Sequence, residues 1–489
     1  MSTPTTELRY GLDDTPRPWT TALGLGLQHV LTAFGATIAV PLLLAPALGF
    51  DATQVAILIS SVFICSGLAT AVQVRFGSRL PIVQGISFAF LGPFFAIIAA
   101  HPGESAMRYI AGAVIAGALV EIVVGYGGVM GLLQRFITPI TIGPVIALIG
   151  LSLYGPAADN AGGNWWLALL TVGLVFLFAL VLAPRVRFLS LFPILLAVVG
   201  AYLVALVLSV TGVFGADAAG YVDFAGVGDA PWFRGVEIGG GGLLLPWGTP
   251  LFDLGFFVAV LAAYLASTIE SFGDYHAISR IVTGRPPEAR QVDRGIGAEG
   301  IGCLLTGLLG GFASTSYSEN IGLVGLTKVA SRVVVLLGAG ALVVLGLVSK
   351  VGAVIATVPT PIVGGVYLSL FGLIAAVGLS NLRRADLDSQ RNLMIVGFVL
   401  FMGLVVPTYV GGLPDDWTLL GVGWLTDLAR SIGSSGIAVA ALLGLLLDNV
   451  VPGTDAERGV GTYDVHVLPE ELPGEPPRDG DDRAGGTRQ

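Results

Sequence analysis

The sequence predicts an all-α polytopic membrane protein with about fourteen transmembrane segments, and its composition and apolar periodicity carry that prediction. Of its 489 residues, 54% are hydrophobic and 12% are charged, and the mean hydropathy is +0.85. This is too apolar for a soluble protein of the same size. Apolar runs recur between residues 20 and 448, and each is long enough to cross roughly 30 Å of hydrocarbon as a helix.

The first and last segments differ from the apolar runs between them. Residues 1–18 are polar and lack a signal-peptide core, so we expect a cytosolic N-terminal tail. Residues 449–489 are acidic, and we expect a disordered cytosolic tail. Cys65 and Cys303 lie inside apolar runs, where a small buried side chain is the simplest interpretation. The expected spans are 20–46, 53–74, 80–100, 108–131, 137–155, 164–183, 188–212, 251–279, 295–311, 313–332, 333–350, 353–379, 391–407 and 431–448.

Basic residues predict the orientation, because short cytoplasmic loops hold most of them. With the N-terminus in the cytosol, the outer side receives only Arg108, Arg234, Lys350 and Arg430. Both termini are then cytosolic, and we expect a multi-pass protein of a prokaryotic plasma membrane. The cytoplasmic side receives Arg75, Arg79, Arg135, Arg185, Arg187, Arg280, Arg285, Arg290, Arg294, Lys328, Arg332, Arg383, Arg384 and Arg391.

The long connection at 213–250 falls outside the membrane and divides the chain into two groups of seven spans. An odd number of spans per half inverts the second half relative to the first. The sequence therefore predicts 7+7 inverted repeats, an architecture in which solute sites lie where interrupted helices meet at the bilayer midplane.

Two spans are interrupted. The third contains Pro81 and Gly85 before an apolar helix, and the tenth contains the hydroxyl-rich run 310–318 before a helix near Glu319. Backbone that leaves helical geometry in the membrane must find partners inside the protein. We therefore expect two short antiparallel strands in spans 3 and 10. Each would lead into a half-helix whose N–H groups face a shared cavity.

Several polar residues converge on the level of these breaks. Counting 1.5 Å per residue from cytoplasmic anchors places Glu270 and Glu319 about 15 Å deep, and His29 and Phe88 reach a similar level. Asp274 lies one turn beyond Glu270 on the same helical face. Ionisable residues in a span are costly and are candidate functional groups, although a structural or capping role is the alternative for each.

The constellation indicates a secondary transporter of a small polar solute rather than an enzyme. The sequence contains no GxxxxGK[ST], HExxH or GxSxG motif, and no basic cluster that would indicate nucleic-acid binding. We expect no metal and no cofactor. The expected partners are a small solute and the lipid bilayer.

Residues 319–328, Glu-Asn-Ile-Gly-Leu-Val-Gly-Leu-Thr-Lys, resemble the signature of the nucleobase–ascorbate transporter family, also called nucleobase:cation symporter 2. That signature has an acidic residue, Gln or Pro, then Asn, any residue, Gly, four variable residues, Thr and a basic residue or Gly. Three further segments resemble family motifs, so the resemblance covers about residues 18–450. They are Gln28-His29, Gly85-Ile86-Ser87-Phe88-Ala89-Phe90 and Glu270-Ser271-Phe272-Gly273-Asp274-Tyr275.

The resemblance implies two domains that move against each other as an elevator, often in a dimer through the gate domain. The core domain would comprise residues 19–131 (spans 1–4) and 251–350 (spans 8–11). The gate domain would comprise residues 137–212 (spans 5–7) and 353–448 (spans 12–14).

The resemblance also implies a role for each motif residue. Glu270 and Glu319 would bind the ring N–H and carbonyl groups of a nucleobase, Phe88 would pack on the ring, and Ser318 and Ala89 would add contacts. Glu270, Asp274 and His29 are the candidates for proton coupling. The structural signature positions are Gln28, Gly85, Ser87, Gly273, Asn320, Gly322 and Thr327.

Two positions point to different substrates. Glu319 occupies a position that is acidic in uracil permeases and some broad nucleobase carriers, but Gln in typical xanthine or urate carriers and Pro in animal ascorbate carriers. Asp274 instead matches the purine and ascorbate branches, whereas the similar bacterial uracil permeases have His there. Uracil is favoured, with xanthine or a broader nucleobase range next.

For mechanism, we expect proton symport, because a neutral Glu270 carboxyl can donate to a base carbonyl and carries no buried charge across the bilayer. Sodium coupling is the alternative, through an oxygen cage that includes Asp274. Symport of ascorbate or another organic anion, and a non-transporting scaffold or channel, are the other functions considered.

Overall fold

The computed structural model describes residues 8–130, 136–186, 189, 191–414 and 416–460. Its helices follow the expected spans closely. In the first half they are α1 (Trp19–Leu48), α2 (Ala52–Arg75), α3 (Leu91–Ala100), α4 (Glu104–Tyr126), α6 (Pro139–Leu151), α7 (Tyr154–Gly162), α8 (Trp165–Phe176) with the π-helical η2 (Leu177–Leu182), and α10 (Pro193–Val210). In the second half they are α12 (Leu254–Thr283), α13 (Ala289–Leu309), α14 (Ser318–Thr327), α15 (Arg332–Leu347), α16 (Ser349–Ala356), α17 (Thr360–Asn381), α18 (Gln390–Gly411), α19 (Gly423–Gly433) and α20 (Gly436–Val450).

In the described part of the chain, nine helices are long and apolar enough to cross a membrane. Two bent pairs, α15 with α16 and α19 with α20, each pass the same test as one broken span. The helix α13 and the two interrupted segments complete the fourteen spans that the sequence predicts.

Local sequence explains how these helices start and stop. Helix α1 ends at Gly49, whose φ of 67° is the left-handed conformation that glycine adopts without strain. Two residues later, Asp51 and Gln54 form a capping box at the start of α2. Helix α12 is capped at its start by Asp253, whose side chain accepts a hydrogen bond from the Phe256 N–H. It is capped at its end by Gly284, with φ 71°. These short turns make neighbouring helices antiparallel.

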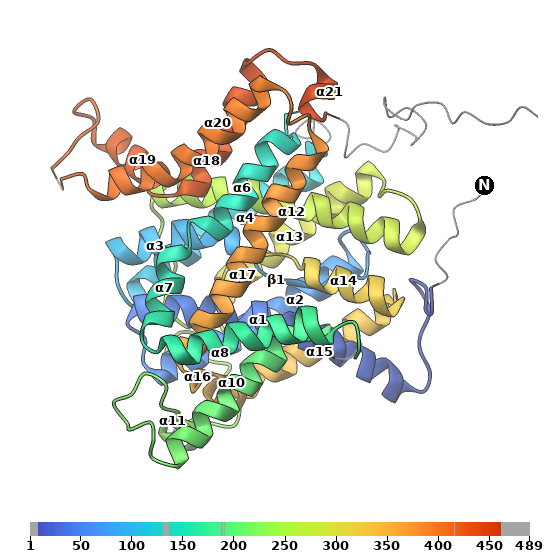
Figure 1. Cartoon of the computed structure of the whole chain (residues 1–489), viewed down its shortest axis with the longest axis vertical. Coiled ribbons are helices and arrows are strands. Elements are labelled where there is room, and N and C mark those ends of the chain that lie inside the picture. The colour runs from blue at the N-terminus through green and yellow to red at the C-terminus, as the bar shows by residue number, and fades with distance from the viewer. Residues whose placement is uncertain (1–7, 131–135, 187–188, 190, 415, 461–489) are drawn as a thin grey trace, which may run out of the picture.

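The predicted strands pair at the centre of the molecule, as the position of β1 in Figure 1 shows. Strand β1 (Gln84–Ile86) runs antiparallel to β2 (Ser314–Ser316), with Gln84 opposite Ser316 and Ile86 opposite Ser314. Strand β1 leads into the 3₁₀ helix η1 (Phe88–Phe90) and then α3, and β2 leads into α14. Both interruptions therefore have the predicted form.

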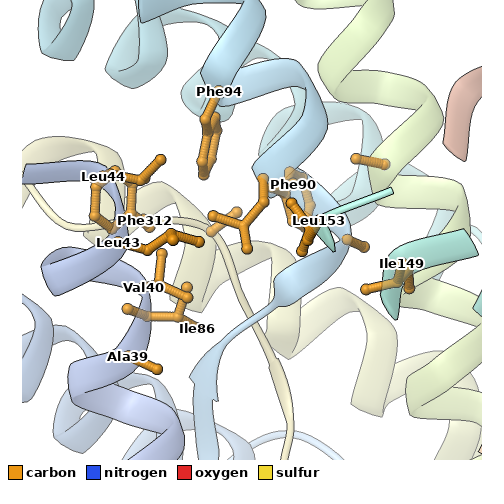
Figure 2. Packing of buried hydrophobic residues seen from close by; sticks show 14 of the residues in the cluster. Ala39, Val40, Leu43, Leu44, Ile86, Phe90, Phe94, Ile149, Leu153 and Phe312 are labelled. Atoms are coloured by element: carbon orange, nitrogen blue, oxygen red, sulfur yellow. The ribbon is translucent and has the colours of Figure 1, made fainter. Parts of the chain in front are cut away.

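Apolar side chains fill the space around this strand pair. Figure 2 shows Val40 and Leu43 of α1, Ile86 of β1, Phe94 of α3 and Phe312 beside one another. The Phe94 and Phe312 rings lie 5.3 Å apart. This packing surrounds the two non-helical segments. Their backbone groups pair with each other, because lipid offers them no hydrogen-bond partner.

The helices pack in two groups. One contains α1, α2, α4, α12, α13, α15 and α16, and the other contains α6, α7, α8, α10, α17, α18 and α20. Contacts between the groups run from α1 to α10 and α17, and from α12 to α6 and α20. Helix α19 contacts both α12 and α20.

Gly85 allows the two strands to close. A Cβ at this position would lie 2.1 Å from Cζ of Tyr317, which is fully packed above the strand. We predict that Gly85→Ala lowers the free energy of unfolding by about 1–3 kcal/mol, the usual cost of overpacking, measured by thermal unfolding of the purified protein. The control is Gly340→Ala in α15, where a Cβ meets nothing within 4 Å; it should raise stability by roughly 0.5–1 kcal/mol. Equal stability of the two variants would contradict this account of Gly85.

The segment expected to be a disordered tail from residue 449 is ordered at its start. Residues 449–460 include the short helix α21 (Asp455–Arg458), and residues 461–489 lie outside the described residues. Arg458 binds Asp448 at 3.2 Å, and Arg391 of α18 binds the same carboxylate at 3.1 Å. The sequence does not indicate that Arg458 binds Asp448. The expected start of the disordered tail at residue 449 was therefore wrong, by at least the length of α21.

Thr138, the residue before α6, also donates to Asp448, at 2.7 Å. Asp448 therefore connects α20 to α18, to α21 and to the start of α6. We predict that Asp448→Asn lowers the free energy of unfolding by about 3–5 kcal/mol, because it leaves two partly buried arginines without their counter-charge. Thermal unfolding measures the change. Asp217→Asn, in the exposed loop, is the matched control and should be neutral; a similarly small change for Asp448→Asn would show that the ion pairs contribute little.

The connection at 213–250 is also partly structured. It contains α11 (Ala225–Asp229) and is attached to α2 by Arg234, which donates to the Ser61 hydroxyl at 2.7 Å. Burial lowers the pKa of the Arg234 guanidinium to about 10, so this anchor stays charged at neutral pH.

Candidate substrate-binding site

Helices α12 and α14 bring the predicted acidic residues to the strand crossing. Glu270 and Asp274 are one turn apart on α12, and Ser318 and Glu319 form the first turn of α14. The Asp274 carboxylate accepts hydrogen bonds from the Ser316 and Ser318 hydroxyls, both at 2.7 Å. Asp274 is thus fixed against the end of β2 and the start of α14.

Glu270 and Glu319 differ from Asp274 because they are half-buried, whereas Asp274 is buried. Within the described residues, no side chain donates a hydrogen bond to either carboxylate. A Cβ added at Gly273 or at Gly322, each three residues after one of the carboxylates, would meet nothing within 4 Å. Both carboxylates therefore keep acceptor capacity that no described side chain uses, on helices that leave open space at Gly273 and Gly322.

The charges around Glu270 are all of one sign. The groups that interact with it electrostatically are the carboxylates of Asp274, Glu319 and Glu299. Glu319 lies in the first turn of α14, where the partial positive charge of the helix N-terminus favours a carboxylate. Such a site suits a ligand that presents N–H groups.

Phe88 lies where the two helix groups meet. It is half-buried at the start of η1, and its ring makes an edge contact at 5.9 Å with Phe371 of α17. Phe371 stacks in turn on Tyr367 at 5.2 Å. Phe371 and Tyr367 are buried, so the half-buried ring of Phe88 is the one with exposed aromatic surface among these three.

Ala89 is placed less favourably than predicted. Its side chain is fully buried in the core, and its N–H donates to the Ser87 hydroxyl at 3.3 Å. Ser87 therefore caps the half-helix, which is a structural role. The Ala89 side chain lies in the core instead of at an exposed surface.

His29 contacts α14 rather than the carboxylates. The Asn320 amide donates to His29 Nδ1 at 3.2 Å and to the His29 carbonyl at 3.0 Å, and the histidine is 3% exposed. Gln28 is half-buried beside it, and Thr327 donates to the Leu323 carbonyl at 2.8 Å near the end of α14. Two signature motifs far apart in sequence thus meet directly.

The sequence reading missed a buried polar network behind Asp274. Glu299 of α13 accepts hydrogen bonds from Ser271 at 2.6 Å, Tyr275 at 2.9 Å and Ser267 at 3.2 Å. Glu121 of α4 is also buried, at 4% exposure. The rule that drew attention to Glu270, an ionisable residue inside an apolar run, applies equally to Glu121 and Glu299 and would have found both.

Comparisons with known proteins identify the family of this chain. The Xan_ur_permease model, described as a permease family, matches residues 20–412. Human solute carrier family 23 member 2 is 37% identical over 93% of this chain and 76% of its own length. Nucleobase-ascorbate transporter 12 of Arabidopsis thaliana is 34% identical over 93% of this chain and 71% of its own length.

Two solved structures share the fold at low sequence identity. The transmembrane domain of the cyanobacterial bicarbonate transporter BicA has a TM-score of 0.54 at 16% identity and covers 81% of this chain and 98% of its own. Murine Slc26a9, an anion transporter, has a TM-score of 0.62 at 9% identity and covers 90% of this chain and 69% of its own. The likeness supports the predicted 7+7 inverted-repeat fold. With the matched family model and the curated relatives, it shows that the chain is a multi-pass transport protein of the nucleobase–ascorbate transporter family.

Proposed function

We propose that this protein imports a nucleobase by proton symport, with uracil favoured and xanthine or a broader nucleobase range next. The observation that carries the proposal is the pair Glu270 and Glu319, two half-buried carboxylates on α12 and α14 to which no described side chain donates a hydrogen bond. Nucleobases offer adjacent ring N–H donors and carbonyl acceptors, which match one ionised and one protonated carboxyl. Phe88 supplies an aromatic surface for the flat ring.

The same arrangement supports proton coupling. A Glu270 carboxyl that takes up a proton gains a donor for a base carbonyl and loses the charge that would be costly to move across the bilayer. Asp274 already accepts two short hydrogen bonds from serines, so it suits an ionised carboxylate and would hold α14 in place. We assign the transported proton to Glu270, with Asp274 as its neighbour. His29 is bonded to Asn320 and is the weaker candidate.

Movement would occur between the two helix groups. The first group, with both strands, corresponds to the core domain at 19–131 and 251–350, and the second to the gate domain at 137–212 and 353–448. Only α1 and α12 of the first group make the contacts with the second group given above, which supports an elevator in which the core slides against the gate. We further propose a plasma-membrane location, cytosolic termini, and a homodimer through the gate domain.

An anionic substrate fits the site less well. Ascorbate or another organic acid would lie beside Glu270, Glu319 and Asp274, and like charges disfavour such a complex unless protons are taken up. The name of the Arabidopsis relative nevertheless includes ascorbate, so ascorbate belongs among the tested competitors.

The test is uptake of labelled uracil and xanthine by cells that lack their own carriers, with each unlabelled competitor in excess, with and without a proton uncoupler, and with sodium replaced. Uncoupler-sensitive uracil uptake that xanthine and ascorbate fail to inhibit supports the proposal in full. Xanthine uptake would make Asp274 the specificity marker. Uptake of ascorbate alone, or uptake that depends on sodium and ignores the uncoupler, would contradict it.

A further inference from the structure

We propose that Glu121 and Glu299 form a second proton-binding site next to the substrate site, in which the pair holds one proton and that proton resides on Glu121. The two carboxyls come from α4 and α13, which pack closely here: a Cβ at Gly300 would lie 2.9 Å from the Ile122 nitrogen. Consecutive residues of α12 contact both, since Ser267 donates to Glu299 at 3.2 Å and Thr268 to Glu121 at 3.5 Å. Glu121 and Glu299 thus contact adjacent residues of α12.

The hydrogen bonds of the two carboxyls are unequal. Glu299 accepts three hydroxyl hydrogen bonds on its two oxygens. Glu121 accepts only the long bond from Thr268 on Oε1, and its Oε2 is buried without a partner among the described residues. Donors stabilise a carboxylate, and a buried oxygen without donors does not tolerate charge. Glu299 is therefore the ionised member, and Glu121 carries the proton.

The other titratable groups described near the pair cannot neutralise a second negative charge. Three are neutral in their ordinary state: Tyr264, which donates to the Val114 carbonyl at 2.9 Å, Tyr275, which donates to Glu299, and Cys303, which contacts Ser314. The fourth, Glu270 of the substrate site, is itself acidic and interacts with Glu299. Two ionised carboxylates would repel each other in a buried setting where no described cation forms an ion pair with either, whereas one proton on the pair leaves a single charge with three donors.

The pair is linked to the substrate site by hydroxyl groups. Ser271 donates to Glu299 at 2.6 Å and lies 3.0 Å from the Thr315 hydroxyl and 3.1 Å from that of Ser316. Ser316 donates to Asp274. The protonation state of the pair can therefore alter the position of β2 and α14. This consequence rests on the proposed function, but the proton site itself does not.

Infrared spectroscopy of the purified full-length protein without nucleobase tests the site. At neutral pH we expect the carbonyl stretch of a protonated carboxyl that shifts in D₂O. It should be lost in Glu121→Gln, remain but shift in Glu299→Gln because the neighbouring negative charge has been removed, and stay unchanged in Glu288→Gln, an exposed control on the loop before α13. A band that persists unchanged in Glu121→Gln, or no such band in the wild type, would overturn the proposal.

Thermal unfolding across pH supplies a second readout. Wild-type protein should lose stability as the pH rises above about 4.3, where Glu121 ionises in the unfolded chain, until the proton also leaves the folded protein; Glu121→Gln should lose less, since its amide has no proton to release. Equal losses would overturn the proposal. The outcome is independent of the substrate: a lost band without nucleobase transport leaves the site standing, and nucleobase symport with an unchanged band removes only the site.

Discussion

Glu270→Gln should abolish uptake that is driven by a proton gradient while retaining nucleobase binding. The amide cannot take up or release a proton, so the coupling step is lost, although it can still bond to a ring carbonyl or N–H. We expect concentrative uptake to fall by a factor of roughly 100 or more, on the scale of losing a proton-transfer group. Binding of labelled uracil to purified protein should weaken far less.

Glu288→Gln is the matched control, because it removes a carboxylate from the exposed loop before α13. It should leave uptake unchanged. Full proton-driven accumulation by Glu270→Gln would remove Glu270 from the coupling mechanism and transfer attention to Asp274.

Glu319→Gln should change selectivity rather than coupling. The substitution removes a charged acceptor beside the open space and introduces the residue that typical xanthine or urate carriers of the family have there. A hydrogen bond to a charged group contributes about 1.5–3 kcal/mol, so uracil affinity should fall by roughly 10- to 100-fold. Xanthine should compete better than in the wild type, as measured by inhibition of labelled uptake.

Glu319→Asp keeps the charge and shortens the side chain, so it separates charge from reach. It should retain the preference for uracil at reduced affinity. If Glu319→Gln kept both the affinity and the preference of the wild type, Glu319 would not contact the base.

The central geometry could be predicted because its signals are local. Pro81, Gly85 and the hydroxyl-rich run at 310–318 cannot continue a membrane helix, and backbone without lipid partners must pair with itself. The strand pair and the start of α14 at Ser318 follow from that argument. Spacing along α12 likewise placed Glu270 and Asp274 on adjacent turns.

Contacts between distant segments could not be predicted in the same way. Nothing in the sequence around His29 indicates that its partner is Asn320, nor that Phe88 would contact Phe371 of α17. Such pairs depend on how helices pack, which span prediction does not address. The ordering of residues 449–460 was missed for the same reason, because Asp448 holds Arg458 only in the folded protein.

Glu121 and Glu299 form a different case. Both lie within apolar runs of the sequence, which is an indication of function. Neither lies in a motif or beside an interrupted span, so neither was selected as a candidate. The structure adds what sequence cannot supply, namely that three hydroxyls donate to Glu299 while an oxygen of Glu121 has no partner among the described residues.

Proton movement measured together with nucleobase entry tests the central claim most directly. Wild-type protein and Glu270→Gln would be reconstituted in vesicles that contain a trapped pH indicator, with uracil added outside in sodium-free buffer. We predict acidification of the lumen with uracil entry for the wild type and none for Glu270→Gln. Uracil entry by the wild type without acidification, or only when sodium is supplied, would contradict proton symport through Glu270.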